Sequence, residues 1–249
     1  MKILTLNCQR AYRREALFNF LSEAINSGEY DAIFLQEAPQ EFLAGIDIWD
    51  LYTLVIDESI KTANGRVAVL VRVGFEIVRT DYSLFERQKT KDKEYFFELI
   101  SVVARDSHSK EYVLASLHMP AYLHIIRRTK HFKKVLRRVE MLEKEGNKKE
   151  GVVAGGDWNS IFPYERGILS LFLHKRFRFV FPKKYSVHGA RIEKGLFWND
   201  FVSKVSSFVN LDYIVDFFLI SSKVEVHSIE VLKDNVSDHS PVSIDIDFK

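Results

Sequence analysis

The sequence has a single cysteine, Cys8, among its 249 residues, so no internal disulfide framework can hold the fold. Cys8 follows the first predicted strand, and we expect a small buried thiol there rather than a redox or nucleophilic centre. The chain also lacks low-complexity segments, repeats of fixed period and any Pro/Gly-rich linker. With 47% hydrophobic residues it can bury a sizeable core, and one domain over residues 1–249 is the simplest organisation.

No apolar run is long enough to cross a bilayer. The short apolar stretch after Met1-Lys2 is too brief for the hydrophobic region of a signal peptide, so we expect a cytoplasmic protein without a transmembrane segment. The formal net charge is only +2 at pH 7, and the overall charge therefore indicates no class of partner. We expect a monomer with no stable protein partner.

What the sequence does contain is a long series of strand-like runs with a few helical segments. Apolar residues at helical spacing predict helices over residues 17–25 and 124–145. The strand-like runs cover residues 3–7, 31–37, 51–56, 66–72, 74–79, 95–105, 111–117, 151–154, 213–220, 224–232 and 241–248. A mostly β pattern with a few helices indicates packed layers of sheets and helices.

Polar residues follow five of the predicted strands. They are Asn7, Gln36-Glu37, His118, Asp157 with Asn159, and Asp238-His239. Sites of sheet proteins gather at strand ends, because the strands are rigid and the loops that follow them are open to solvent. Each residue taken singly has an ordinary structural explanation, such as a turn or a surface carboxylate. The functional interpretation therefore depends on the whole set.

As a set, these residues supply the groups that hydrolysis of a phosphate ester requires. Hard divalent cations such as Mg²⁺ take oxygen ligands, usually one or two carboxylates with water and substrate phosphate. The oxygen donors at the strand ends are Glu37, Asp157, Asp238, Asn7 and Asn159. Activating water and stabilising the developing charge also require proton-transfer groups and hydrogen-bond donors, which His118 and His239 can provide.

Four segments, in order along the chain, resemble the motifs of the endonuclease/exonuclease/phosphatase superfamily. They are Asn7 after Leu-Thr-Leu, Gln36-Glu37 after Phe34-Leu35, Gly156-Asp157-Trp158-Asn159-Ser160 and Ser237-Asp238-His239-Ser240-Pro241. These motifs run from the first predicted strand to the last, so the resemblance covers essentially the whole chain. It implies a DNase I-like α/β fold, a four-layer α/β/β/α sandwich of two facing mixed sheets flanked by helices, with a site at the sheet edges.

The resemblance also implies roles for the motif residues. Glu37 would be the main ligand of a divalent metal, Mg²⁺ or alternatively Mn²⁺, with Asn7 beside it and Asp238 in the same region. Asp157 would position or deprotonate the attacking water. Asn159 would donate a hydrogen bond to the phosphate and so contribute to substrate binding.

His239 would contact the scissile phosphate, as a base or as a charge stabiliser, and an aspartate would orient it. Two residues, Asp212 and Asp216, compete for that orienting role. The run from Asp216 to Ser221 matches the Asp-aromatic-apolar-apolar-apolar-Ser pattern of the family, and we prefer Asp216 for this reason.

The resemblance implies that His118 acts as, or helps, the acid that protonates the leaving oxygen, as in the DNase I, sphingomyelinase and 5-phosphatase branches. DNase I relatives pair this histidine with a glutamate. The strand that would carry it here begins Asn64-Gly65-Arg66 and has no carboxylate, so Glu98 on a later strand is a possible substitute. After Asn7 the chain continues Cys8-Gln9-Arg10, unlike abasic-site endonucleases, although Gln9 could still help a metal site.

Two clusters of basic residues bear on the substrate. The first, along the helix predicted over residues 124–145, we interpret as a solvated outer face far from the sheet edge. The second, over residues 174–194, lies where the family can carry substrate-facing loops, and its interleaved aromatic residues are either core or stacking platforms. In and beside this interval we expect substrate-binding side chains at His188, Arg191 and Trp198.

Together the motifs predict a Mg²⁺-dependent phosphoric diester hydrolase. Nucleic acid is favoured as the substrate because of the basic interval. The alternative is a phosphatase or phosphodiesterase that acts on phospholipids or small phosphorylated metabolites. A binding module without catalysis is the weakest hypothesis, because the residues that such modules lose are all present.

Overall fold

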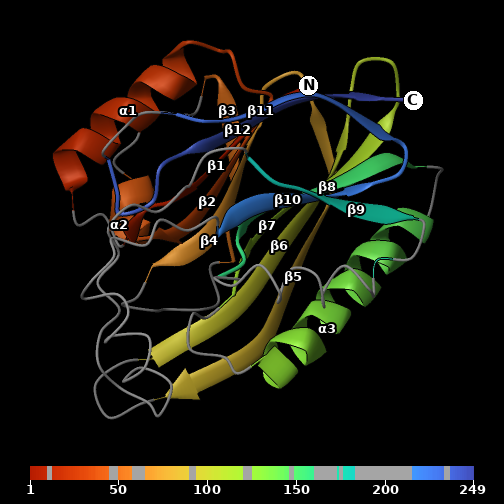
Figure 1. Cartoon of the computed structure of the whole chain (residues 1–249). Helices are drawn as coiled ribbons and strands as arrows, with labels where there is room; N and C mark the ends of the chain where they lie inside the picture. Colours follow the sequence, from red (N-terminus) through yellow and green to blue (C-terminus); the bar gives the residue numbers. More distant parts are fainter. Residues whose placement is uncertain are drawn as a thin grey trace.

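Two six-stranded sheets make up the centre of the protein in the computed structural model, which describes residues 1–9, 13–44, 50–57, 65–89, 94–119, 125–145, 149–159, 173, 176–182, 215–232 and 236–249 (Figure 1). The first sheet has the order β11 (Val224–Val231), β12 (Val242–Phe248), β1 (Lys2–Asn7), β2 (Ala32–Ala38), β4 (Arg66–Arg72) and β3 (Tyr52–Val55). The second has the order β5 (Glu76–Lys89), β6 (Glu94–Arg105), β7 (Glu111–His118), β8 (Lys149–Asp157), β10 (Asp216–Ser221) and β9 (Phe177–Val180).

Each sheet contains one parallel pair, whose strands are joined through a helix. In the first sheet β1 and β2 are parallel and joined through α1 (Arg14–Asn26), and a short helix α2 (Gln40–Leu43) follows β2. In the second sheet β7 and β8 are parallel and joined through α3 (Ile125–Lys144). The other described strand pairs are antiparallel, so both sheets are mixed.

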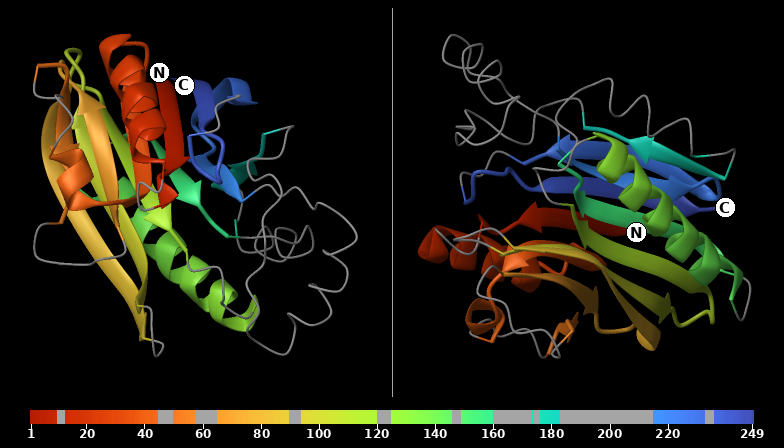
Figure 2. Two further views of the ribbon diagram at one scale, coloured as in Figure 1. Left: turned by 90° about the vertical axis from the view of Figure 1, so that its left-hand side faces the viewer. Right: turned by 90° about the horizontal axis from the view of Figure 1, so that it is seen from below.

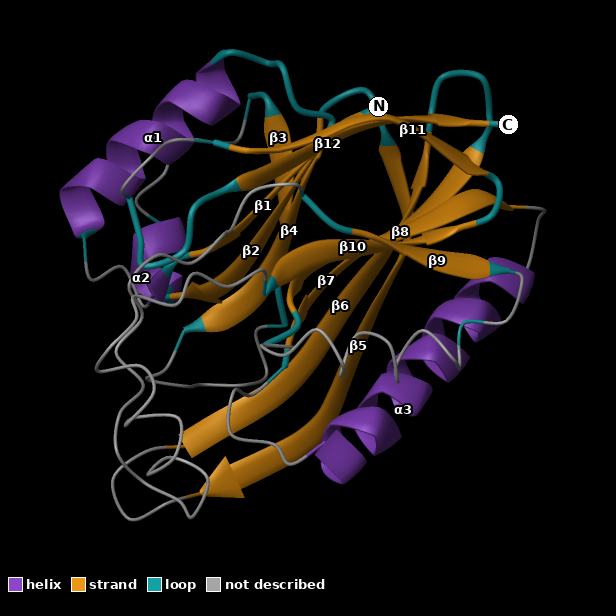
Figure 3. Cartoon of the chain, in the orientation of Figure 1, coloured by secondary structure: helices purple, strands orange, loops and turns teal. Residues whose placement is uncertain are grey.

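The hydrophobic residues form three cores that define four layers. Leu17 and Leu21 of α1 pack on one face of the first sheet, and Phe132 and Val135 of α3 pack on one face of the second. A third core, which includes Phe34 of β2 and Phe218 of β10, lies between the sheets. Figure 3 shows the two longer helices on the outer sides of the paired sheets. The predicted four-layer sandwich is thus confirmed, and no helix of the described residues is both long and apolar enough to span a membrane.

The bounds predicted from the sequence for several strands differ from those in the structure. The strand predicted over residues 74–79 runs to Lys89, and its second half pairs with β6 although it carries polar and charged residues. These side chains can be tolerated because β5 is an edge strand of its sheet. The four-residue strand β9 was not predicted, and the run predicted over 213–220 forms a strand from Asp216 onward, with 213 and 214 outside the described residues.

The strand directions bring the polar strand ends to one edge of the sandwich. The carboxyl ends of β1 and β2 meet there, because these strands are parallel, and those of β7 and β8 meet in the same way. β10 runs antiparallel to β8 with Asp216 opposite Asp157, so β10 begins at that edge. Residues 236–241 lead into β12 at the end of β1, and the chain termini lie at the opposite end (Figure 2).

A buried polar contact ties the two sheets together just behind this edge. The Gln36 side chain donates from Nε2 to the hydroxyl of Ser116 on β7, at 2.9 Å. The Ser116 hydroxyl in turn donates to the carbonyl of Leu35, at 3.2 Å. Both side chains are buried between two apolar faces. Burying their polar groups there without hydrogen bonds would cost free energy, and these two contacts supply the hydrogen bonds. The amide of Gln36 therefore fixes how the sheets meet under the strand ends.

The close approach of β7 and β8 at this edge depends on Gly156. Its φ is +144°, and a Cβ built there would lie 2.1 Å from the carbonyl oxygen of Leu117. We expect Gly156→Ala to lower the free energy of unfolding by about 3 kcal/mol, because strain and a backbone clash add. Gly28→Ala is the matched control, since Gly28 has φ +61° with no atom near the added Cβ, and we expect it to cost about 1 kcal/mol. Urea unfolding of both variants measures these losses in the free energy of unfolding. Equal losses in the two variants would contradict the prediction.

Candidate active site

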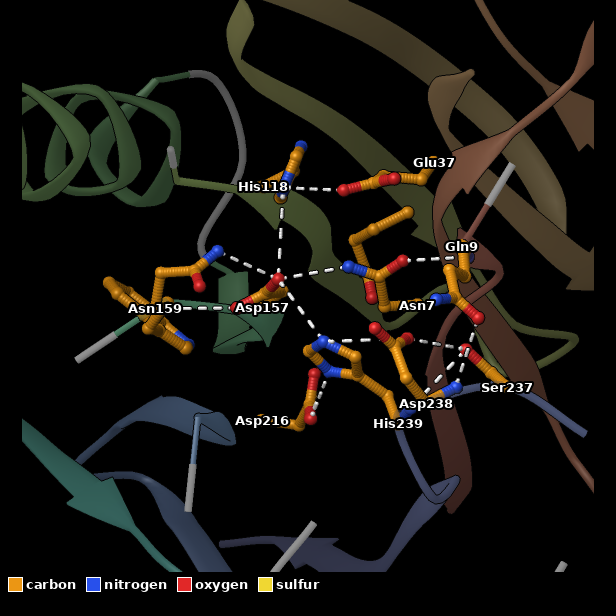
Figure 4. A network of polar contacts seen from close by, with 12 residues as sticks. Asn7, Gln9, Glu37, His118, Asp157, Asn159, Asp216, Ser237, Asp238 and His239 are labelled. Atoms are coloured by element: carbon orange, nitrogen blue, oxygen red, sulfur yellow. Dashed lines mark hydrogen bonds and ion pairs between the residues drawn. The ribbon is translucent and has the colours of Figure 1, made fainter. Parts of the chain in front are cut away.

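Eight side chains singled out in the sequence converge at the shared edge of the two sheets (Figure 4). The first sheet and the loop before β12 supply Asn7, Glu37, Asp238 and His239, and the second sheet supplies His118, Asp157, Asn159 and Asp216. Hydrogen bonds and close charged contacts link them into one network. Asp212, His188, Arg191 and Trp198 lie outside the described residues.

Asp157 is the centre of the network. Its Oδ2 accepts hydrogen bonds from Nδ2 of Asn7 at 2.9 Å and from Nδ2 of Asn159 at 2.8 Å. Its Oδ1 accepts the backbone N–H of Asn159, also at 2.8 Å. Burial raises the pKa of Asp157 to about 6, although the nearby imidazoles of His239 and His118 oppose this shift. The carboxylate is therefore ionised at pH values above about 6 and is held at both oxygens.

His239 pairs with Asp216, the residue preferred from the sequence. The imidazole Nδ1 donates to Oδ2 of Asp216 at 2.8 Å, and its Nε2 lies 4.0 Å from Oδ2 of Asp157. Burial lowers the pKa of His239, but the charges of Asp216, Asp157 and Asp238 outweigh it and raise the pKa to about 10. His239 is accordingly an imidazolium at neutral pH, which suits it to stabilising negative charge rather than to accepting a proton.

A group of oxygen donors faces His118 from the side of the first sheet. Oε1 of Glu37 lies 3.4 Å from Nε2 of His118, and the Glu37 side chain is 21% exposed. Oδ1 of Asn7 accepts the backbone N–H of Gln9 at 2.9 Å, and Oε1 of Gln9 accepts that of Asp238 at 3.3 Å. Glu37 and Gln9 have positive φ values of 50° and 45°, a strained conformation that concentrates at functional sites.

Glu37, Asn7 and Asp238 form an oxygen set around Glu37. This set fits a hard divalent cation, because it offers carboxylate and amide oxygens at a partly exposed position. A second group, Asp157, Asp216 and His239, also has one ligand atom of each residue within 4.8 Å of the others and could hold a metal. In that group, however, His239 donates to Asp216 and carries a raised pKa. A protonated imidazole cannot be a ligand, so the oxygen set around Glu37 is the better candidate.

Glu98, the possible partner of His118, lies opposite it in the register of β6 and β7. Directly opposed residues of antiparallel strands have neighbouring side chains on the same face. Glu98 is buried, which raises its pKa, and its Oε2 accepts the backbone N–H of Val67 at 3.3 Å. Glu98 therefore remains a candidate for the carboxylate that pairs with His118.

The loop that carries Asn159 is anchored by Trp158. The indole is fully buried, donates from Nε1 to the carbonyl of Phe217 at 2.9 Å and stacks on the Phe217 ring at a centroid distance of 5.2 Å. Phe179 and Phe181 of the basic interval pack in the same cluster. Of the two alternatives left open for the interleaved aromatics, these two belong to the core.

The interpretation of the arginine and lysine residues along this helix as a solvated outer face far from the site is wrong for Arg128. Arg128 and His131 of α3 are buried, with 2% and 3% of their surfaces exposed. Arg128 donates to the carbonyls of Trp158, at 3.1 Å, and Asn159, and His131 pairs with Glu86. The sequence held a signal for Arg128, because it lies three residues after Ile125 and four before Phe132, on the apolar stripe.

Comparisons with solved structures agree with this architecture. An endonuclease/exonuclease/phosphatase protein from Bacteroides vulgatus matches with a TM-score of 0.75 at 13% identity, covering 100% of this chain and 98% of the other. D. rerio TDP2 complexed with a single-strand DNA product has a TM-score of 0.75 at 14% identity, covering 99% and 98%. A mannosyl-6-phosphatase from Bacteroides thetaiotaomicron has a TM-score of 0.72 at 13% identity, covering 100% of each chain.

No protein-family model matches the sequence, and no curated protein matches it. At identities this low, similarity over whole chains establishes the fold alone. That similarity confirms the resemblance found in the four sequence motifs: this chain has the fold of the endonuclease/exonuclease/phosphatase superfamily.

Proposed function

We propose that the protein is a divalent-metal-dependent phosphodiesterase that hydrolyses a phosphate ester by direct attack of water. The observation that carries this proposal is the contact between the sheets, in which Asn7 of the oxygen set donates to Asp157 at 2.9 Å. This contact supports the proposal, because it joins the side chains we assign to the cation and to the base with the imidazoles of His118 and His239 in one network. These are the components that attack on a phosphate requires.

In the proposed reaction Asp157 takes a proton from the attacking water. Its pKa of about 6 leaves it ionised at neutral pH yet basic enough to accept that proton. The water oxygen bonds to phosphorus as the bond to the leaving oxygen breaks. His239, as an imidazolium held by Asp216, donates from Nε2 to the phosphate and stabilises the charge that develops there.

His118 protonates the leaving oxygen, so the products are a phosphate monoester and an alcohol. Glu37, Asn7 and Asp238 would hold the cation, which when bound supplies neutralisation of the phosphate charge. The Asn159 amide is engaged with Asp157 and with the carbonyl of Met119, at 2.6 Å. Donation to substrate phosphate, the role expected for Asn159, requires that one of these hydrogen bonds exchange for the phosphate oxygen.

Nucleic acid is the substrate class we favour. The basic interval after β8 supports it, and the similar D. rerio TDP2 is complexed with a single-strand DNA product. The second candidate, a small phosphorylated metabolite, is favoured by the equally extensive similarity to a mannosyl-6-phosphatase. Both candidates use the same catalytic groups and differ in what surrounds the phosphate.

A substrate panel with and without metal tests the proposal. Purified protein in Mg²⁺, in Mn²⁺ and in excess chelator is assayed against single- and double-strand oligonucleotides, bis-p-nitrophenyl phosphate, sphingomyelin, phosphoinositides and sugar phosphates. We expect metal-dependent cleavage of the diesters, greatest for oligonucleotides. Turnover of sugar phosphates alone would select the second candidate, and no turnover of any ester would reject the proposal.

The assignment of the cation site makes a separate prediction for Glu37→Gln. We expect kcat/KM at fixed Mg²⁺ to fall on the order of 100-fold, because an amide is a weaker ligand than a carboxylate, and the Mg²⁺ concentration for half-maximal activity to rise. Glu225→Gln is the matched control, since Glu225 is an exposed residue of the edge strand β11. A Mg²⁺ titration of activity in both variants tests this prediction. If both variants reach half-maximal activity at the same Mg²⁺ concentration, Glu37 is not a ligand of the cation.

A further inference from the structure

Arg128 carries a buried guanidinium that donates hydrogen bonds to the backbone directly after β8. It lies in the first turns of α3, with 2% of its surface exposed, and is followed on the same helix face by Phe132 and Val135 of the core. Burying a charge on an apolar face is costly unless hydrogen bonds compensate for the lost hydration. The Arg128 side chain donates to two consecutive carbonyls, those of Trp158 and Asn159.

The second of these carbonyls belongs to a residue in a strained conformation. Asn159 has φ +46°, in the left-handed region that residues other than glycine seldom occupy. Such a conformation costs free energy and persists only where surrounding contacts determine it. Contacts determine it here from both sides, because Arg128 donates to its carbonyl while its own backbone N–H donates to Asp157 at 2.8 Å.

The left-handed conformation is what lets one residue hold both oxygens of Asp157. The backbone N–H of Asn159 reaches Oδ1 and its side-chain Nδ2 reaches Oδ2, each at 2.8 Å (Figure 4). The same Nδ2 donates to the carbonyl of Met119 at 2.6 Å. If Asn159 relaxed to a right-handed or extended conformation, rotation about its N–Cα bond would turn its side chain away from Oδ2 of Asp157 while its N–H stayed on Oδ1, and the clamp on the carboxylate would open.

We propose that Arg128 is a positioning residue, which acts through Asn159 to hold the carboxylate of Asp157 in the orientation that attack by water needs. The proposal rests on the proposed function in that Asp157 is the base. It adds a role for a helix residue that touches neither substrate nor metal. A displacement of about 1 Å in a reacting group can reduce the rate about 100-fold, so a support of this kind can have a large kinetic effect.

The kinetic test compares Arg128→Met, Arg128→Lys and Arg138→Met. Methionine keeps an unbranched side chain of similar reach but donates no hydrogen bond, whereas lysine can still donate to one carbonyl. Arg138 is the matched control, because it is another arginine of α3 and its Nε donates to Asp81 of β5, at 2.8 Å. All three variants are assayed on the best substrate of the panel in Mg²⁺.

We expect Arg128→Met to lower kcat about 100-fold with KM changed less than about 3-fold, because the clamp concerns the base and not the binding of substrate. Arg128→Lys should recover about 10-fold of this loss. Arg138→Met should leave kcat within about 2-fold of the wild-type value. A loss confined to KM, or equal kcat values for wild type and Arg128→Met, would overturn the proposal.

A structural readout separates this inference from the proposed function. In asparagine-labelled protein, the side-chain amide resonances of Asn159 are expected to shift and broaden in Arg128→Met but to stay unchanged in Arg138→Met. This holds whether or not the protein cleaves any ester in the panel. If the Asn159 resonances of folded Arg128→Met and Arg128→Lys match those of wild type, Arg128 does not position the loop, even if the enzyme is active.

Discussion

Asp157→Asn is expected to reduce kcat by about 10³-fold in Mg²⁺, the largest effect of a single isosteric change in this protein. The amide has the shape of the carboxylate but cannot take a proton from water. It also turns an NH₂ donor toward groups that themselves donate, Nδ2 of Asn7 and of Asn159. Single-turnover assays measure the chemical step directly. Asp247→Asn, an exposed residue of β12, serves as the control for which no change is expected.

The same variant has a predicted effect on stability. Burial raises the pKa of Asp157 to about 6, so the folded protein favours the protonated carboxyl. Its stabilising contribution is complete below the unfolded pKa of about 4 and is lost as the pH rises through about 6. We therefore expect wild type to lose stability relative to Asp157→Asn over that interval, in urea unfolding of chelator-treated protein. A parallel pH dependence in the two proteins would contradict the assigned pKa.

His239→Gln is expected to lower kcat on the order of 10²- to 10³-fold, because it removes the charged donor proposed for the phosphate. Glutamine can still hydrogen-bond Asp216, so the variant tests the charge rather than the contact. His108→Gln, in the exposed turn between β6 and β7, is the control. Retention of full activity by His239→Gln would remove His239 from the mechanism.

The stability of the protein should also respond to alkaline pH through His239. Its folded pKa, raised to about 10, lies above the unfolded value of about 6.5. The stability that this ion pair contributes is fully present below about pH 6.5 and is lost as the pH rises through about 10. We expect this loss in chelator-treated wild type and not in His239→Gln, measured as unfolding midpoints between pH 6.5 and 10.

The candidate site could be predicted because its residues sit where a sheet ends. Asn7, Glu37, His118 and Asp157 each lie at the end of a run of buried strand residues, and an apolar run that ends in polar residues is visible in sequence. Strand direction then brings them to one edge. The pairing of His239 with Asp216 was expected from a motif and could not be derived from spacing, since 23 residues separate the two along the chain.

Arg128 escaped prediction for a different reason. Among several cations of one helix, composition favours the solvated interpretation for all of them, and only the phase of the helix identifies the one that points inward. The full length of β5 was missed because an edge strand needs no second pairing partner and tolerates charged side chains. In both places the residue type alone is misleading, because the phase of the helix and the place of the strand in the sheet determine where a charged side chain lies.

The place of β12 in the first sheet has a consequence for how the candidate site assembles during folding. This strand pairs with β1 on one side and β11 on the other, and the loop just before it carries Asp238 and His239. A chain in which Val242–Phe248 had not yet inserted beside β1 would leave one edge of that strand open and would not hold His239 against Asp216. We therefore expect assembly of the candidate site and closure of the first sheet to coincide during refolding.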